Sequence, residues 1–219
     1  MLWDNIMKKP LVGAMLLLSS ICQAGNVEVW VFDNNNKPVV NVAVHLNNQN
    51  IVSLPVVQDM PIMDQIKKQF SPHILVVQKN TQIRFPNSDL IKHHVYSFSP
   101  AKVFQLKLYK GLNADPLLFS KTGVVELGCN VHDSMLGYIY VVDTPYFGKT
   151  DANGRFSIEV PDADYQVRLW HPQIQDGMDS LLKTLAVNGR SNISFTLQQT
   201  LLPSSVLYEQ DTEEFGDYE

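Results

Sequence analysis

The sequence has few cysteines and no concentration of basic residues, and both absences exclude classes of protein. It contains 2 Cys in 219 residues, and its 17 Lys and Arg are outnumbered by 22 Asp and Glu, for a formal net charge of -5. Recognition of nucleic acid needs clustered Lys and Arg that neutralise phosphates. We therefore expect no nucleic-acid partner. Hydrophobic residues make up 45% of the chain, which is enough for one large globular domain or two small ones.

The N-terminal segment has the pattern of a signal peptide. Lys8-Lys9 precedes an apolar stretch over residues 11–21, and residues 22–24 place small side chains at both positions that signal peptidase reads. The apolar stretch is too short to span a bilayer, so we expect cleavage after Ala24, a periplasmic mature protein and no integral membrane span. The alternative is a lipoprotein in which Cys22 is acylated, although the bulky residue before it does not suit that signal.

Cleavage would leave the mature protein with one cysteine. Cys129 would then be an unpaired thiol in an oxidising compartment, where most cysteines form disulfides. Such a thiol needs either deep burial or a bound partner.

The mature chain reads as many short strands with turn residues between them. Val27–Val31 and Val40–Leu46 alternate between apolar and polar residues around an Asn-rich turn, and similar β-rich segments recur up to residue 197. Residues 60–70 are predicted to be loop or weakly helical. This pattern predicts an all-β protein, with more strands than one small sandwich holds and hence two β units.

The segment that carries chemistry is Cys129-Asn130-Val131-His132-Asp133-Ser134-Met135. It places a thiolate, an imidazole and a thioether at C-x-x-H-x-x-M spacing. Cys and Met are soft ligands that favour Cu(I), imidazole suits both oxidation states, and two His and one Cys with a weak axial Met form a blue-copper site. The second His should come from a neighbouring strand, and His93-His94 is available. Alternation puts His93 on the same face as Val95.

Four ordered motifs resemble the plastocyanin, azurin and amicyanin family, the blue-copper proteins or cupredoxins. Phe70–Val77 resembles the family's F-x-P strand, Thr81–Asn87 a strand ending in V-x-F-x-N, Asn87…His93-His94-Val95 the loop of the first ligand, and Gly137–Val141 the closing strand. The resemblance implies one mononuclear type 1 copper held by His93, Cys129, His132 and Met135. Because the family's ligand stands two residues before the Val, it favours His93 over the alternative, His94.

The wider chain resembles exported proteins of the "methylamine utilization protein" type, and its two ends resemble carboxypeptidase regulatory-like (transthyretin-like) sandwiches. Val27–Leu46 is similar to their opening hairpin, and Thr150–Phe156 with Pro161…Tyr165 to their T-D-x-x-G-x-F and P-x-x-Y motifs. The expected fold is a Greek-key cupredoxin barrel or sandwich inserted in, or packed beside, a smaller transthyretin-like sandwich. The predicted divisions are a signal peptide (1–24), the first part of the small sandwich (25–54), the cupredoxin domain (55–143), the second part of the sandwich (144–198) and an acidic disordered tail (199–219).

The predicted function is one-electron transfer by a single type 1 copper site. His132 resembles the exposed ligand at which the family's electrons enter, so a redox protein such as a cytochrome is expected to dock transiently there. We expect no enzymatic activity, because multicopper oxidases and copper nitrite reductases need further paired histidines. The alternatives are a non-redox copper carrier or sensor, and a structural β-sandwich with a vestigial site. His45 and His171 are interpreted as exposed or capping residues.

Overall fold

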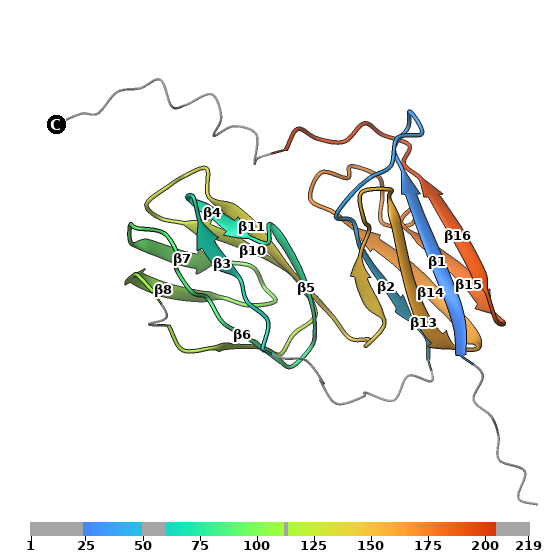
Figure 1. Cartoon of the computed structure of the whole chain (residues 1–219), viewed down its shortest axis with the longest axis horizontal. Helices are drawn as coiled ribbons and strands as arrows, with labels where there is room; N and C mark the ends of the chain where they lie inside the picture. The colour runs from blue at the N-terminus through green and yellow to red at the C-terminus, as the bar shows by residue number, and fades with distance from the viewer. Residues whose placement is uncertain (1–23, 50–59, 112–113, 205–219) are drawn as a thin grey trace, which may run out of the picture.

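The computed structural model describes residues 24–49, 60–111 and 114–204, and in these ranges the chain forms strands and no α-helix (Figure 1). The all-β class predicted from the sequence is therefore confirmed. The predicted signal peptide, including Cys22, lies outside the described residues except for Ala24, and the predicted acidic tail does so from residue 205 onward. Within the described ranges no helix has the length and apolar character needed to cross a membrane.

One β-sandwich, which we call the flanking sandwich, is built from strands at the two ends of the described chain. Its sheets have the strand orders β13-β1-β16 and β12-β2-β14-β15. Side chains from both sheets, among them Val29, Val44, Val167 and Phe195, form one apolar core. The strands are β1 (Ala24–Phe32), β2 (Ala43–Asn47), β12 (Phe147–Lys149), β13 (Arg155–Pro161), β14 (Ala163–Trp170), β15 (Leu182–Val187) and β16 (Ser191–Thr196).

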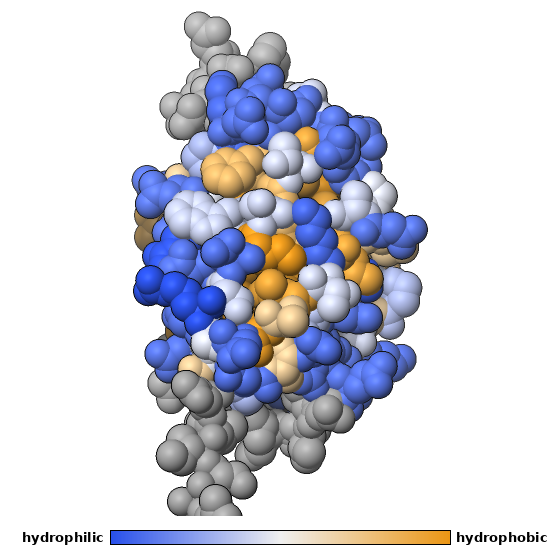
Figure 2. Space-filling model, turned by 90° about the vertical axis from the view of Figure 1, so that its right-hand side faces the viewer, coloured by the Kyte–Doolittle hydropathy of each residue, from blue (hydrophilic) through white to orange (hydrophobic). Residues whose placement is uncertain are grey.

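Strand β1 shows how the sequence builds this sandwich. Val27, Val29 and Val31 are fully buried, whereas the intervening Glu28 and Trp30 are half-buried on the opposite face. Burial of each valine contributes roughly 1.5 kcal/mol or more. On the outer face, Arg155 forms a 2.9 Å ion pair with Glu28 and its guanidinium lies over the Trp30 ring. That face is largely hydrophilic around an apolar band (Figure 2).

The segment between β2 and β12 forms the second unit, which we call the central unit. Its main sheet has the order β5-β11-β10-β7-β8, and the pairs β3-β4 and β6-β9 complete it. Its separate core includes Phe85, Phe119, Leu127 and Ile139. The strands are β3 (Asp64–Ile66), β4 (Gln69–Ser71), β5 (Ile74–Gln78), β6 (Thr81–Ile83), β7 (His93–Ser97), β8 (Phe104–Tyr109), β9 (Leu117–Phe119), β10 (Gly123–Cys129) and β11 (Leu136–Val142).

The chain order makes the central unit an insertion in the flanking sandwich. Sheets of the flanking sandwich contain only β1, β2 and β12–β16, and sheets of the central unit contain only β3–β11. Strand β1 pairs in parallel with β16, which joins the two ends of the described chain. Of the two arrangements that the resemblance predicted, inserted in the smaller sandwich or packed beside it, the strand order shows the inserted one.

Residues 60–70 differ from the loop or weak helix predicted for them. They contain β3 and most of β4, which pair as an antiparallel hairpin with Gln65 opposite Phe70. Lys67 and Lys68 form its turn with φ angles of 52° and 57°. Lysine has no preference for this left-handed conformation, so these residues carry no turn signal.

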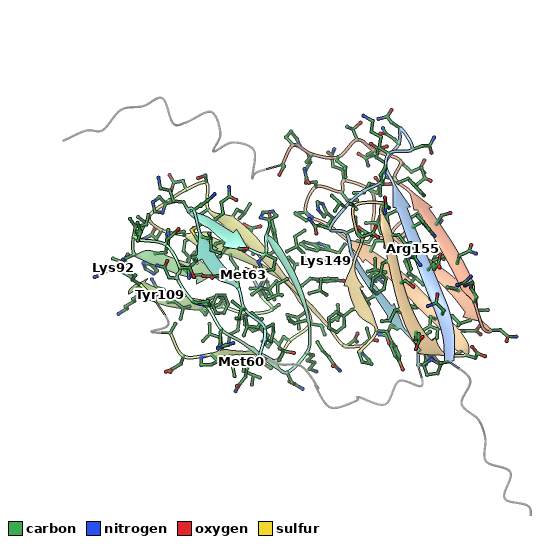
Figure 3. All side chains as sticks on the ribbon, viewed as in Figure 1. Met60, Met63, Lys92, Tyr109, Lys149 and Arg155 are labelled. Atoms are coloured by element: carbon green, nitrogen blue, oxygen red, sulfur yellow. The ribbon has the colours of Figure 1, made fainter. Side chains whose placement is uncertain are left out.

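Aromatic side chains join the two units. The Trp170 ring of β14 packs against both Tyr138 and Tyr140 of β11, with centroid distances of 5.6 and 5.2 Å. Lys149, which lies between the units in Figure 3, donates from Nζ to the Ile74 carbonyl oxygen at 2.7 Å. His45 packs on Tyr140 with ring centroids 5.6 Å apart. The two units therefore share a packed aromatic interface.

His45 is buried, at 8% exposure, so the interpretation of it as an exposed or capping residue is wrong. His171 is equally buried, but its Nδ1 accepts a 3.2 Å hydrogen bond from the Gln173 backbone N–H, as a capping residue does. Burial lowers the pKa of each imidazole to about 4. Both rings are therefore neutral in the folded protein at pH 7.

We expect the metal-free protein to lose stability as the pH falls from about 6.5 to about 4. In this window His45 and His171 bind protons in the unfolded chain and stay neutral in the folded one, so protons favour unfolding. The full effect is on the order of 3 kcal/mol for each histidine. Urea unfolding at several pH values measures it, and His45→Gln and His171→Gln should each flatten the profile. Equal unfolding free energies at pH 7 and pH 5 would contradict the prediction.

Candidate metal centre

Cys129 ends strand β10 in the core of the central unit. Its thiol is buried, at 3% exposure, and is not in a disulfide. The residue lies opposite Val95 of β7 in an antiparallel ladder. The strand therefore places the sulfur beside the residues that begin β7.

His93 is the first residue of β7 and is fully buried. Its Nδ1 lies 3.6 Å from the Cys129 sulfur. His94 lies on the other side of the strand, where its Nε2 is 2.7 Å from Gln105 Nε2. A register shift in the β7–β8 pairing falls between His93 and Val95. Irregularities of this kind re-aim side chains near functional sites.

His132 reaches the same sulfur from the loop between β10 and β11. Its Nδ1 lies 4.0 Å from Cys129 Sγ, and its ring centroid is 5.0 Å from that of His93. Two backbone hydrogen bonds shape the loop, from the N–H of Asn130 to the His94 carbonyl and from the N–H of Met135 to the His132 carbonyl. His132 is half-buried, so this edge of the site reaches the surface.

These three donor atoms lie within 4.8 Å of one another and could hold one metal ion. An ion bonded to nitrogen at about 2.0 Å and sulfur at about 2.3 Å, with about 120° between the bonds, needs those two atoms roughly 3.7 Å apart. The sulfur–nitrogen distances of 3.6 and 4.0 Å are close to this value. The geometry of the three side chains therefore fits a mononuclear metal.

Met135 lies in the same core as Cys129 and is 1% exposed. Together with Cys129 it lines a hollow of about 460 Å³ between the β7 hairpin and the loop, which also includes Tyr96 and Asp133. The structure thus buries the thioether near the thiol, and axial ligation by Met135 stays a prediction.

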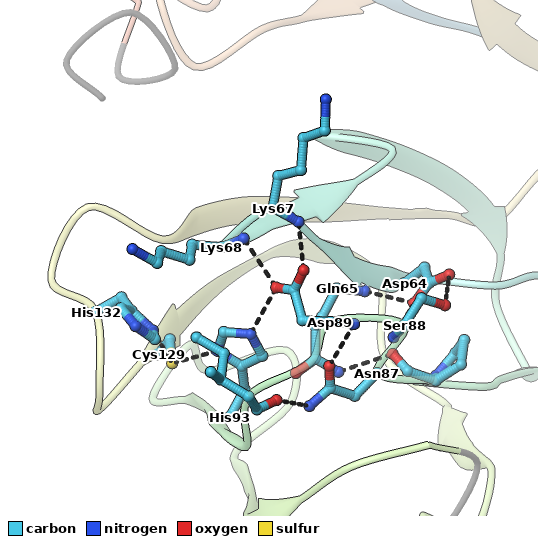
Figure 4. A network of polar contacts seen from close by, with 12 residues as sticks. Asp64, Gln65, Lys67, Lys68, Asn87, Ser88, Asp89, His93, Cys129 and His132 are labelled. Carbon is cyan, nitrogen blue, oxygen red and sulfur yellow. Dashed lines mark hydrogen bonds and ion pairs between the residues drawn. The ribbon is translucent and has the colours of Figure 1, made fainter. Parts of the chain in front are cut away.

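Asp89 contacts a candidate ligand, and no sequence motif indicated this role. Its Oδ2 lies 2.8 Å from Nε2 of His93, and the backbone N–H groups of Lys67 and Lys68 donate to its two oxygens (Figure 4). Burial alone would raise the pKa of Asp89, but these bonds outweigh it and hold the pKa below its usual value. The ionised carboxylate therefore accepts a hydrogen bond from the Nε2–H of His93, and this tautomer leaves the Nδ1 lone pair free for a metal.

The loop that carries Asp89 is fixed from both sides. Asn87 donates from Nδ2 to the carbonyl oxygens of Ile91 and Tyr109, and its Oδ1 accepts from the N–H of Asp89. Buried Gln65 donates to the Tyr109 hydroxyl and to the Pro86 carbonyl, which ties the β3–β4 hairpin to this loop. The hairpin missed in the sequence therefore positions the partner of a predicted ligand.

Replacing Asp89 with asparagine should weaken binding of Cu(II) by about tenfold or more, because the neutral amide makes the His93 imidazole less basic and no longer fixes its tautomer. Competition titration with a copper chelator measures the change. The matched control is Asp133→Asn, an exposed carboxylate on the β10–β11 loop. An equal loss in both variants would show a general charge effect and contradict the assigned role.

Comparison with known proteins gives partial matches only to solved structures. No family model matches the chain, and no curated protein matches it. A Cu-containing nitrite reductase (NirK) from Thermus scotoductus SA-01 is 19% identical over 43% of this chain and 25% of its own, with a TM-score of 0.37. The reduced Cu(I) form at pH 4 of an amicyanin mutant is 19% identical over 45% of this chain and 98% of its own, with a TM-score of 0.35. The oxidised state of another amicyanin mutant gives the same values.

Proposed function

We propose that the protein binds one copper ion in a type 1 site and transfers single electrons. His93, Cys129 and His132 are the proposed equatorial ligands, and Met135 is the proposed weak axial ligand. The observation that carries the proposal is the buried Cys129 sulfur at 3.6 and 4.0 Å from two imidazole nitrogens. Thiolate and thioether favour Cu(I), and imidazole suits both Cu(I) and Cu(II).

Copper bound there would supply one-electron exchange between Cu(II) and Cu(I). The protein's part is to hold the donors in place during that exchange. The Asp89 carboxylate fixes the His93 ring, and the two backbone bonds of the β10–β11 loop fix the positions between Cys129 and Met135. Because Cys129, His93 and Met135 are all nearly inaccessible, water has little access to these donors.

The surface near His132 supports docking of a redox protein. Leu90 and Ile91 precede His93, Val131 precedes His132, and these three side chains are 87%, 40% and 50% exposed. Exposed apolar side chains in the segments that carry His93 and His132 suit a small, transient interface. We propose that a partner such as a cytochrome exchanges electrons here, and that the protein has no catalytic reaction of its own.

We also propose that the mature protein is periplasmic, after cleavage of residues 1–24. The basic and apolar pattern of that segment supports export. For the remainder we propose the divisions 25–54, 55–143, 144–198 and 199–219. The separation of the sheets into β1, β2 and β12–β16 on one side and β3–β11 on the other supports the first three of these.

The decisive experiment is titration of the purified mature protein with Cu(II), followed by visible and EPR spectroscopy and voltammetry. We expect binding of one equivalent, an intense thiolate-to-Cu(II) charge-transfer band and a reversible one-electron wave. Binding without the band or the wave would favour the non-redox copper carrier or sensor. Failure to retain copper would reject the proposal.

A further inference from the structure

A polar cleft lies between the two units, on residues separate from those of the candidate metal centre. The cleft has a volume of about 370 Å³. Strands β2, β14 and β15 of the flanking sandwich form one wall, and the start of β10 and the end of β11 form the other. Ligand sites occur preferentially between domains, in pockets of comparable size.

The sheet register gathers polar side chains on this wall. Arg168 of β14 lies opposite His45 of β2 on one side and Leu182 of β15 on the other. Gln166 lies opposite Asn47 in the same ladder. Directly opposed residues of antiparallel strands share a face, so these five side chains form one surface.

His45 has an unsatisfied nitrogen that is buried beneath this surface. The residue is 92% buried, and its Nδ1 has no hydrogen-bond partner in the described part of the chain. A buried polar atom without a partner costs about 1–3 kcal/mol. The Nδ1 atom is itself covered by protein, and the His45 residue lines the cleft.

Two opposite charges border the same cleft without pairing. Within residues 24–49, 60–111 and 114–204, the Arg168 guanidinium has no ion-pair or hydrogen-bond partner. The Asp143 carboxylate accepts one hydrogen bond, at 3.1 Å from Asn47 Nδ2. The charges of Arg168 and Asp143 both act electrostatically on the His45 and Tyr140 side chains, so both charges lie near these two rings.

We propose that this cleft binds a free α-amino acid. The guanidinium of Arg168 holds the carboxylate, and the carboxylate of Asp143 receives the ammonium group. Tyr140 and Leu182 provide an apolar surface for the side chain. Inorganic phosphate has no positive group that could contact the Asp143 carboxylate, and it would leave most of the cleft empty. A metal ion is disfavoured because it would be repelled by the unpaired positive charge of Arg168.

Thermal-shift assays with each standard amino acid, followed by calorimetric titration of the best one, test this proposal. We expect binding at millimolar or lower concentration, and at least tenfold weaker binding of both its amide and its N-acetyl derivative. Inorganic phosphate is the control anion. Absence of binding by every amino acid, or equal affinity for the derivatives that lack one charge, would overturn the proposal.

Variants separate this site from the metal centre. Arg168→Gln and Asp143→Asn should each lower the affinity at least tenfold. The control Arg155→Gln, on the outer sheet where Arg155 pairs with Glu28, should leave it unchanged (Figure 3). Asp143 is exposed, so its variant tests the site even where loss of Arg168 disturbs folding.

Cys129→Ser should bind the amino acid with the affinity of the parent protein, so failure of the copper assignment leaves this result intact. Equal affinity in Asp143→Asn and the parent protein would contradict the assigned ammonium contact.

Discussion

Cys129→Ser is expected to abolish the visible absorption of the copper-loaded protein. The proposed band arises from charge transfer between the thiolate sulfur and Cu(II), and a serine hydroxyl is neither ionised at neutral pH nor a soft ligand. The Cys129 sulfur lies 3.6 and 4.0 Å from the Nδ1 atoms of His93 and His132, so the substitution removes the only thiolate among the three proposed equatorial donors. Absorption spectra of the parent and the variant, each with one equivalent of Cu(II), measure the effect.

The variant needs a check of its fold, because Cys129 is part of the central core. Serine is nearly isosteric, and burial of its hydroxyl costs on the order of 1–3 kcal/mol without a hydrogen bond. We therefore expect a lower melting temperature and an unchanged β-sheet circular dichroism spectrum. If the folded variant kept the parent's visible band, Cys129 would not be the ligand.

His93→Ala should lower the affinity for Cu(II) by roughly a hundredfold or more, since it removes one of three strong donors and leaves the half-buried Asp89 carboxylate without its imidazole partner. His94→Ala is the matched control. His94 follows directly in the chain, but its ring interacts with Gln105 and not with the Cys129 sulfur. Chelator competition for both variants measures the difference.

The pair of variants decides between the two histidines that the sequence left as alternatives. We expect His94→Ala to keep both the affinity and the absorption band of the parent protein. A larger loss in His94→Ala than in His93→Ala would reverse the assignment. Equal small losses would show that neither imidazole is essential for binding.

The all-β fold was predictable because its signals are local. Alternation in β1 sets which side chains are buried, and Val27, Val29 and Val31 follow it without exception. The β3–β4 hairpin was not predictable, because Lys67 and Lys68 adopt φ angles that lysine rarely takes. Their conformation depends on the Asp89 carboxylate, which accepts from both backbone N–H groups.

The candidate site likewise has residues that the sequence predicted and residues that it did not. The sequence supplied Cys129, His132 and Met135 on one loop, because three donors at fixed spacing are visible without a structure. Asp89 precedes His93 by four residues in a loop, where the spacing does not show in which direction a side chain points. Its role depends on the Asn87 and Gln65 contacts that fix the loop in space.

By itself the sequence determined the strand-rich class and the types of donor available to a metal. These follow from side-chain periodicity and residue chemistry, which act over a few neighbouring positions. The nested order of the two units was expected only from the resemblance of its motifs to two known families. Only the tertiary structure decided which imidazole lies 3.6 Å from the sulfur, that Asp89 fixes that ring, and that His45 and Arg168 share a cleft with Asp143. Those relations depend on how strands distant in the chain pair and pack, and no local pattern encodes such distances.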